Sequence, residues 1–219
     1  MAISKFNYNS FNVTPVAGAA LAFDADADGF STATSTALTH IKTLTASSSA
    51  TLSFVDGSSD VVFDNTYPVY LFKFFNIHPA STQPFLFQGS TDTGSSYGVT
   101  MTSSAFRVFN NEAGTSTSLS ADTGNDQAQA TGFQKLHGNI VNSNDHGGSG
   151  ELYIFSPSST TFVKHFLSRI NASLDDAVVQ EQFIAGYFNT TSAIDAIQFK
   201  MNSGNIDSGT IKLYGIKDS

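Results

Sequence analysis

The sequence predicts an all-β protein built as an antiparallel β-sandwich with long polar loops. Ser and Thr together supply 53 of the 219 residues, while the helix formers Glu and Lys number only three and eight. Phe, Tyr and Thr, which fit a pleated and half-buried surface, are plentiful. Short apolar runs recur along the chain with turn residues between them, and this spacing is typical of a sandwich.

The expected strands come in close succession over the first half of the chain and again after residue 150. Asp56 and Gly57 mark a turn with positive φ between two of them. Residues 175–189 fit a helix or a strand, and Gly186 together with the β-rich context favours the strand. We expect strands at residues 41–45, 51–55, 61–64, 69–77, 85–88, 98–102, 106–109, 151–155, 161–167 and 182–189.

Residues 68–79 form the most apolar stretch of the chain. Their nearly continuous hydrophobicity predicts a central strand that is covered on both faces, with Phe72 and Phe74 in the core. Residues 110–150 are rich in Asn, Asp, Gly, Ser and Thr. They predict long loops with at most a short helix at residues 126–136.

The C-terminal residues show two alternating runs, 194–201 and 210–216, on either side of a turn-rich segment. In the first run Ile197, Phe199 and Met201 share one face, and in the second Ile211 and Leu213 do so. This pattern predicts a β-hairpin that buries Phe199 and Leu213.

The length suits one large domain. We expect residues 31–219 to form a single β-sandwich domain. Residues 1–30 form either an N-terminal arm or an edge strand of that domain. The rings of Phe6, Tyr8 and Phe11 lie among polar residues, so an arm could bury them on a neighbouring subunit.

Charge and composition exclude several classes of function. The net charge is −8, and the ten Lys and Arg residues are scattered, which argues against nucleic-acid binding. No apolar stretch approaches the length of a membrane span, and we expect no membrane insertion. The first residues lack the basic and then apolar pattern of a secretory signal, so synthesis in a cytoplasm is expected. There is no Cys for disulfides or thiolate chemistry.

An acidic segment is the only metal-site candidate in the sequence. Asp24, Asp26 and Asp28 alternate before Gly29, like the first half of a calcium loop. The bidentate Glu of an EF-hand is missing, because Ser35 occupies the twelfth position. The favoured interpretation is a solvated acidic turn, and the alternative is a calcium site of another class.

Enzyme chemistry has no pattern to support it, and we predict no catalytic residue and no cofactor. Glu112, Glu151 and Glu181 are the only glutamates from which a glycosidase pair could draw. The histidines show no metal-ligand spacing, and we expect each to be an ordinary loop or strand-edge residue. They are His40, His78, His137, His146 and His165.

Several segments resemble small virion structural proteins, fibre-like or capsid-decorating, of tailed bacteriophages with marine or cyanobacterial hosts. They are strand and turn patterns that run along most of the chain, so no functional residue is carried over. The segments are residues 11–18, 41–46, 53–57, 67–72, 76–79, 151–157 and 161–165, together with the C-terminal runs. The resemblance implies a jelly-roll-like module that is displayed on a virion, commonly as a trimer.

These observations lead to the hypothesis of a non-enzymatic virion structural protein of a tailed phage. It would be a capsid-decoration or fibre component that assembles by protein–protein contacts, with other copies in a homotrimer and with other virion proteins. The alternative is a carbohydrate-binding receptor-recognition module of a tail fibre. Such a module would bind host surface glycan through Tyr8, Tyr97 or Tyr187. An enzyme that hydrolyses host glycan is the third class.

Overall fold

A computed structural model describes residues 21–23, 30–32, 37–174 and 177–217. The chain divides into two compact units, Met1–Leu38 and Thr39–Ser219. In the first unit β1 (Leu21–Phe23) pairs antiparallel with β2 (Phe30–Thr32). The aromatic residues at positions 6–11 lie outside the described residues, so the arm and the edge strand both stay predictions.

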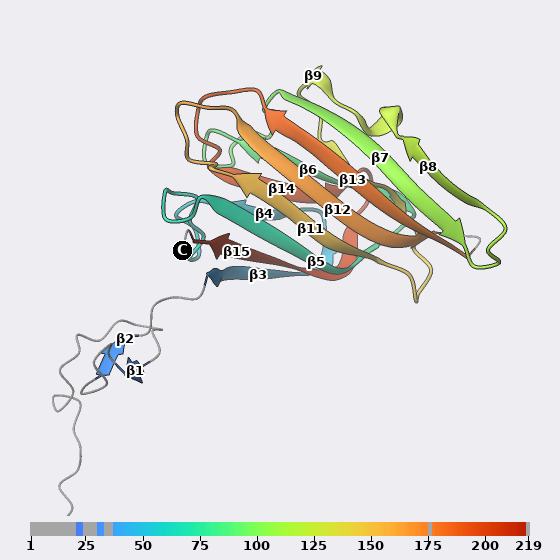
Figure 1. Ribbon diagram of the computed structural model, residues 1–219, viewed down its shortest axis with the longest axis horizontal. Helices are drawn as coiled ribbons and strands as arrows, with labels where there is room; N and C mark the ends of the chain where they lie inside the picture. The colour runs from blue at the N-terminus through green and yellow to red at the C-terminus, as the bar shows by residue number, and fades with distance from the viewer. Residues whose placement is uncertain (1–20, 24–29, 33–36, 175–176, 218–219) are drawn as a thin grey trace, which may run out of the picture. The chain divides into compact units, whose positions relative to one another are not determined.

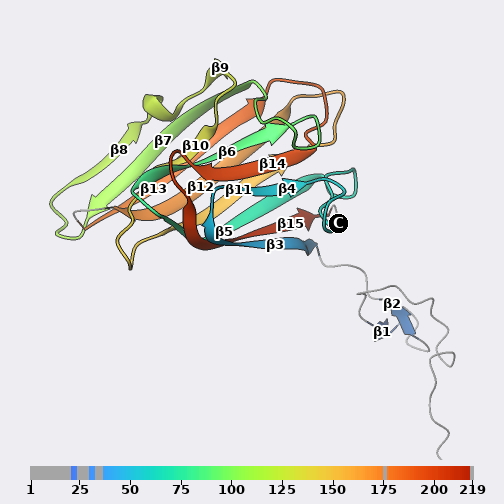
Figure 2. The same ribbon diagram turned by 180° about the vertical axis from the view of Figure 1, so that it is seen from behind.

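The second unit is a sandwich of two antiparallel sheets (Figures 1 and 2). The small sheet has the strand order β10-β6-β14-β4 and the large sheet the order β3-β15-β5-β11-β12-β13-β7-β8, with β9 also paired to β7. The small sheet contains β4 (Leu52–Val55), β6 (Gln83–Ser90), β10 (Gln134–Ile140) and β14 (Ala196–Met201). The large sheet contains β3 (Leu38–Ser49), β5 (Val69–Pro79), β7 (Met101–Asn111), β8 (Thr117–Ala121), β9 (Ala128–Ala130), β11 (Gly148–Phe155), β12 (Lys164–Leu174), β13 (Val178–Phe188) and β15 (Ile206–Ile216).

Eight of these strands have the order of a jelly roll, and we call these eight strands the jelly-roll frame. One half of the frame is β3-β15-β5-β11 and the other is β4-β14-β6-β10, so the chain crosses repeatedly between the sheets. Two Greek keys folded onto each other give this double-sheet arrangement. The prediction of an all-β, jelly-roll-like sandwich is therefore confirmed.

The other strands widen the large sheet beyond the frame. β12 continues the sheet from β11 and forms a long hairpin with β13, and β7 pairs with β13 on the far side. β10 of the small sheet and the 3₁₀ turn η2 (Thr123–Asn125) lie close to the inner side of this extension. The large sheet thus has an inner face toward the small sheet and a broad outer face, which Figure 1 shows in front.

An aromatic cluster fills the core between the sheets. The ring of Phe199 on β14 lies 5.1–6.5 Å, centroid to centroid, from five other rings. Those rings are Phe54, Phe72, Phe74, Phe85 and Phe87. Phe72, Phe74, Phe199 and Leu213 are all buried, so the predicted core residues are confirmed.

The predicted C-terminal hairpin is wrong in its pairing. Both runs are strands, but β14 lies between β6 and β4 in the small sheet, whereas β15 lies between β3 and β5 in the large sheet. Alternation only requires that one face of a strand be buried, and a strand of either sheet satisfies it. Residues 202–205 therefore cross between the sheets.

Two glycines adopt backbone conformations that other residues rarely take. Gly57 has φ +73° in the predicted turn after β4, and the prediction of that turn is confirmed. Gly209 has φ +121° where the register of β15 on β5 shifts, and a Cβ there would lie 2.7 Å from the carbonyl oxygen of Asn76. Gly209 thus permits the bulge that starts the last strand.

The prediction of long loops over residues 110–150 is also wrong. This region contains β8, β9 and β10 and the start of β11, and its short helical turn precedes the segment where a helix was expected. The signal for β10 is weak because it carries buried polar residues such as Gln134 and His137 beside Leu136 and Ile140. Hydrophobic periodicity detects apolar faces only.

Smaller differences concern three other elements. Residues 61–64 form no strand, although Val61 and Phe63 are buried. The two strands expected at residues 98–102 and 106–109 are one strand, β7. β5 is not covered on both faces, since Phe75 is 41% exposed on it. The ambiguous segment 175–189 contains strand β13, as predicted.

Candidate functional site

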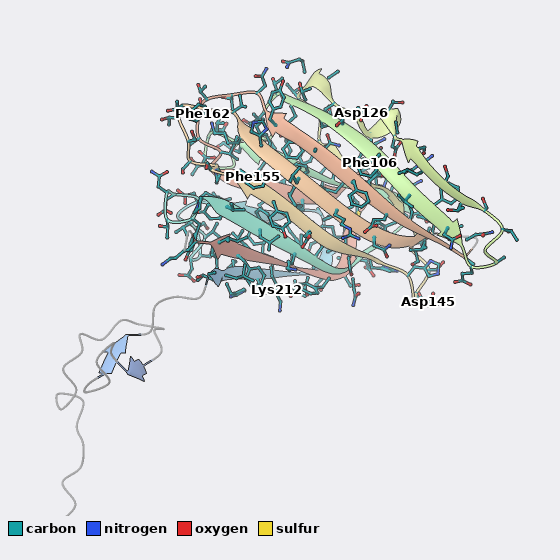
Figure 3. All side chains as sticks on the ribbon, in the orientation of Figure 1. Phe106, Asp126, Asp145, Phe155, Phe162 and Lys212 are labelled. Atoms are coloured by element: carbon teal, nitrogen blue, oxygen red, sulfur yellow. The ribbon has the colours of Figure 1, made fainter. Side chains whose placement is uncertain are left out.

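The outer face of the large sheet carries a row of aligned side chains that come from distant parts of the chain. Figure 3 labels three residues of this face, Phe106, Phe155 and Lys212. The row is formed by register, because each residue lies directly opposite the next on the adjacent strand. From β7 to β15 it contains Phe106, Phe183, Arg169, Glu151, Lys73 and Lys212.

An apolar hollow of about 270 Å³ opens beside one end of this row. The rings of Phe106 and Phe183 stack with centroids 4.6 Å apart and planes 9° from parallel. The next opposed pair on this face of β7 and β13 is Ser104 and Ala185, whose short side chains leave the space open. Leu167 also lines the hollow and is 48% exposed.

Tyr153 lies across the apolar hollow from the stacked rings and adds a polar group to its lining. Burial raises the pKa of the Tyr153 hydroxyl, so this group stays protonated and neutral at physiological pH. The hollow therefore offers mostly rings and alkyl groups, and its polar groups are this phenol, the hydroxyls of Ser104 and Ser168 and the charged ends of Glu151 and Arg169. This lining suits a side chain of a protein partner.

Charges of both signs continue the row beyond the rings. Arg169 lies over the Phe183 ring, 5.4 Å from Cζ to the centroid, and donates a hydrogen bond to Glu181. Lys73 donates from Nζ to Oε2 of Glu151 at 3.4 Å. Such exposed pairs each contribute about 0–1 kcal/mol, so their main effect is on the charge of the surface.

The row is less acidic than the chain as a whole. Lys212 holds its Nζ 5.3 Å from the Phe75 ring centroid, which turns it away from the opposed Lys73. Together with Glu181, the row holds two lysines, one arginine and two glutamates, whereas the net charge of the chain is −8. A second acidic molecule that approaches this row therefore meets less repulsion than the net charge of the chain would give.

A second hollow, of about 430 Å³, lies at the loop between β11 and β12. We call it the hydroxyl hollow. Its lining combines hydroxyls, one amide, two phenyl rings and an imidazole: Asn65, Phe155, Ser156, Ser158, Ser159, Thr160, Thr161, Phe162, Val163 and His165. Phe162 is 73% exposed, the highest value among the exposed large hydrophobic residues that the structure describes.

A shallow depression connects the two hollows. It shares Leu167 and Ala185 with the apolar hollow and His165 with the hydroxyl hollow. Tyr187 lines it, and the Tyr187 ring lies 5.8 Å from that of His165. The outer face is thus hollowed from the stacked rings of Phe106 and Phe183 to the β11–β12 loop.

Buried polar side chains gather under the extension of the large sheet. Gln182 on β13 accepts hydrogen bonds at Oε1 from Asn125 and Gln180, both at 3.5 Å. Gln134 donates to the carbonyl oxygen of Asn125 at 2.8 Å. These contacts tie η2 and β10 to β13, so the cluster has a structural role. His137 lies in it, and burial lowers the pKa of its imidazole to about 4.

Lys164 is buried at the start of β12. Its Nζ donates to the carbonyl oxygens of Thr190 at 3.1 Å and Ser192 at 2.5 Å. Burial lowers the pKa of this ammonium group. Lys164 therefore fastens the loop between β13 and β14 to the sheet.

The predicted site residues are dispersed. Asp24, Asp26 and Asp28 lie outside the described residues, between β1 and β2, and the calcium alternative stays a prediction. Glu151 and Glu181 lie on the outer face, each in an ion pair. In the described part of the chain no group of three or more His, Cys, Asp or Glu residues is placed to hold a metal ion.

The three tyrosines that the sequence suggested for sugar contact do not share one site among the described residues. Tyr8 lies outside the described residues. Tyr97 is half-buried in the loop after β6, away from both hollows. Tyr187 lines the connecting depression beside His165. The sequence did not indicate Phe162 or the stacked pair of Phe106 and Phe183, and register across the sheet is what assembles that pair.

Comparisons with known proteins give no match. No family model, no curated protein and no solved structure corresponds to this chain. Among the described residues, no helix has the length and apolar character needed to cross a membrane.

Proposed function

We propose that this chain is a non-enzymatic virion structural protein of a tailed phage that self-associates through the outer face of its large sheet. It would be displayed on the particle as a capsid-decoration or fibre component. The apolar hollow is the observation that carries the proposal. Phe106, Phe183 and Leu167 present apolar surface there that a neighbouring subunit can bury.

The energetics of the outer face support association. Complete burial of one large apolar side chain contributes about 1.5–3 kcal/mol. Phe106 is 46% exposed and Leu167 48% exposed, so both have area left to bury. Stacked rings at the centre of a patch are typical anchors of protein interfaces. The mixed charges of the row would fix how a second copy is oriented.

The fold and the sequence resemblance support the placement on a virion. Double-sheet jelly rolls are common in viral capsid proteins, although a fold alone does not determine a function. The resemblance to phage virion proteins runs along most of the chain and implies a trimer. A second copy of this chain is therefore the proposed partner.

Light scattering of the purified protein over a range of concentrations tests the association. We expect a trimer for the wild type and a monomer for the double variant Phe106→Ser, Phe183→Ser. Phe162→Ser is the matched control, because Phe162 is 73% exposed in the loop between β11 and β12 and does not line the apolar hollow. A wild type that stays monomeric at every concentration contradicts the proposal, as does a folded double variant that stays trimeric.

Immunogold labelling tests the placement separately. An antibody raised against residues 39–219 is applied to purified tailed particles from infected cells that produce this chain. Label on capsids or tails supports the proposal and distinguishes decoration from fibre. A protein that is abundant in the lysate and absent from the particles overturns it.

A further inference from the structure

The shape of the hydroxyl hollow is fixed by hydrogen bonds of its backbone and of the Ser158 and Asn65 side chains. Ser156 donates its backbone N–H to the carbonyl oxygen of Pro68 at 2.7 Å, and Ile194 donates to that of Pro157 at 2.9 Å. Ser158 donates its hydroxyl to Oδ1 of Asn65 at 2.7 Å. The shape of the hollow is therefore present before any ligand binds, which lowers the entropic cost of binding.

Several hydrogen-bonding groups in the hollow are unused. In the described part of the chain, the hydroxyls of Thr160 and Thr161 and the Nδ2 amide of Asn65 make no hydrogen bond. Ser159 Oγ accepts from the backbone N–H groups of Thr161 and Phe162 and keeps its own proton for donation. The rim of the hydroxyl hollow thus carries hydrogen-bond donors and acceptors that have no partner in the described part of the chain.

Two phenyl rings complete the lining. Phe155 ends β11 and Phe162 lies near the end of the loop, and Figure 3 shows both at the same end of the sheet. The face of an aromatic ring carries partial negative charge, so it attracts the weakly positive C–H groups of an apolar surface. A pyranose ring has such a C–H face and carries hydroxyls around its edge.

The lining also disfavours anionic ligands. It contains no Lys, Arg, Asp or Glu side chain, and its only titratable group is the imidazole of His165. A phosphate or carboxylate would find no cation there and would meet a chain of net charge −8. The volume of about 430 Å³ lies within the roughly 300–1,000 Å³ of small-molecule sites.

We propose that the hydroxyl hollow binds a neutral sugar ring, as one unit of a surface glycan. The ring of Phe162 covers the C–H face of the sugar. Thr160, Thr161 and Asn65 exchange hydrogen bonds with its hydroxyls. This site is separate from the apolar hollow and does not depend on the proposed self-association, so the two proposals can fail independently.

The test is an NMR titration of the ¹⁵N-labelled full chain with methyl α-glucoside, methyl α-galactoside and methyl α-mannoside. At least one neutral probe is expected to shift the amide signals of residues 156–163 in a saturable way. Galacturonate, which has the ring of galactose with an added carboxylate, is expected to bind at least tenfold more weakly than the neutral probes. Its repulsion from the acidic chain finds no compensating cation.

Two variants identify the groups responsible. Phe162→Ala is expected to weaken binding about tenfold, the effect of losing a ring contact of roughly 1.4 kcal/mol. Thr161→Ala is expected to weaken it by a smaller factor. Leu119→Ala is the matched control, since Leu119 is 70% exposed and Phe162 is 73% exposed. Both side chains are exposed enough for the variants to fold.

Three outcomes overturn the proposal. They are the absence of shifts with all three neutral probes, shifts that saturate away from residues 156–163, and binding that Phe162→Ala leaves unchanged. Galacturonate binding as tight as that of the neutral probes contradicts the assignment to neutral sugars. If the protein binds sugar but stays monomeric, the result supports sugar binding and contradicts the proposed self-association.

Discussion

The Nε2 atom of His137 lies 3.5 Å from the Nε2 atom of Gln180, and both side chains are buried between the sheets. The amide group is a donor, so the imidazole nitrogen that faces it must be the acceptor. His137 is therefore held in the neutral form. A proton added at Nε2 would bring two donors together in a site with little access to water.

Stability is expected to fall with acid because of His137. Its pKa is about 4 in the folded chain against 6.5 for an unperturbed histidine, so between these values the unfolded chain binds more protons. The free energy of unfolding should decrease as the pH falls from 6.5 to 4, by about 3 kcal/mol from this group. Urea unfolding at several pH values measures the slope.

His137→Gln is the control for that slope. The variant should lose the decrease between pH 6.5 and 4 and keep the losses that acidic groups cause at lower pH. Asp92 is one such group, because hydrogen bonds from the hydroxyls of Ser96 and Ser90 lower its pKa to about 2. An identical slope in wild type and variant would show that His137 is not responsible.

The aromatic core should be most sensitive at Phe199, whose ring lies beside five others. Phe199→Ala leaves a cavity that those rings border, and the expected loss in the free energy of unfolding is about 3–5 kcal/mol. Phe199→Leu should lose less, because it fills part of the space. Leu119→Ala should change stability by less than about 0.5 kcal/mol. Chemical denaturation of the three variants checks this ranking.

Lys164→Met should loosen the loop between β13 and β14. The substitution keeps most of the buried stem and removes the two hydrogen bonds to carbonyl oxygens. We expect a loss of about 1–3 kcal/mol and faster hydrogen exchange at residues 189–193. A variant as stable as the wild type would mean that the cost of burying the ammonium group equals the gain from its hydrogen bonds.

Gly150→Ala should disrupt the pairing of β11 with β12. A Cβ at this position would collide with the carbonyl oxygen of Arg169 and lie 2.7 Å from Cα of Ile170, and backbone atoms cannot turn aside. The expected cost is about 3 kcal/mol, measured by thermal unfolding. Gly147→Ala is the control, because its nearest atom lies at 3.5 Å. Equal effects at both positions would contradict the explanation.

Alternation in the sequence predicted which side chains enter the core and left the strand pairing open. Phe199 was identified from the alternation of residues 194–201, and Phe72 from the nearly continuous apolar run of residues 68–79. The same alternation placed β14 and β15 in one hairpin, although they belong to opposite sheets. Only the long-range contacts of the folded chain decide between these arrangements.

The candidate site was harder to predict than the core, for a different reason. Phe106 becomes a neighbour of Phe183 and Arg169 through the register of β7, which is far in sequence from the hairpin of β12 and β13. Polar residues such as His137 and Lys164 have no apolar pattern to reveal their burial. The Ser and Thr residues of the hydroxyl hollow look like any polar loop until their position beside Phe162 is known.

The first and last strands of the jelly-roll frame lie next to each other, and this affects how the protein is made. The hydroxyls of Thr45 on β3 and Thr210 on β15 are 165 residues apart in sequence and 3.5 Å apart in space. β3 has its place in the large sheet only beside β15, so the sheet cannot be completed before residues 206–216 have been synthesised. A product truncated before residue 206 would leave β3 without a partner and the edge of β5 open to aggregation.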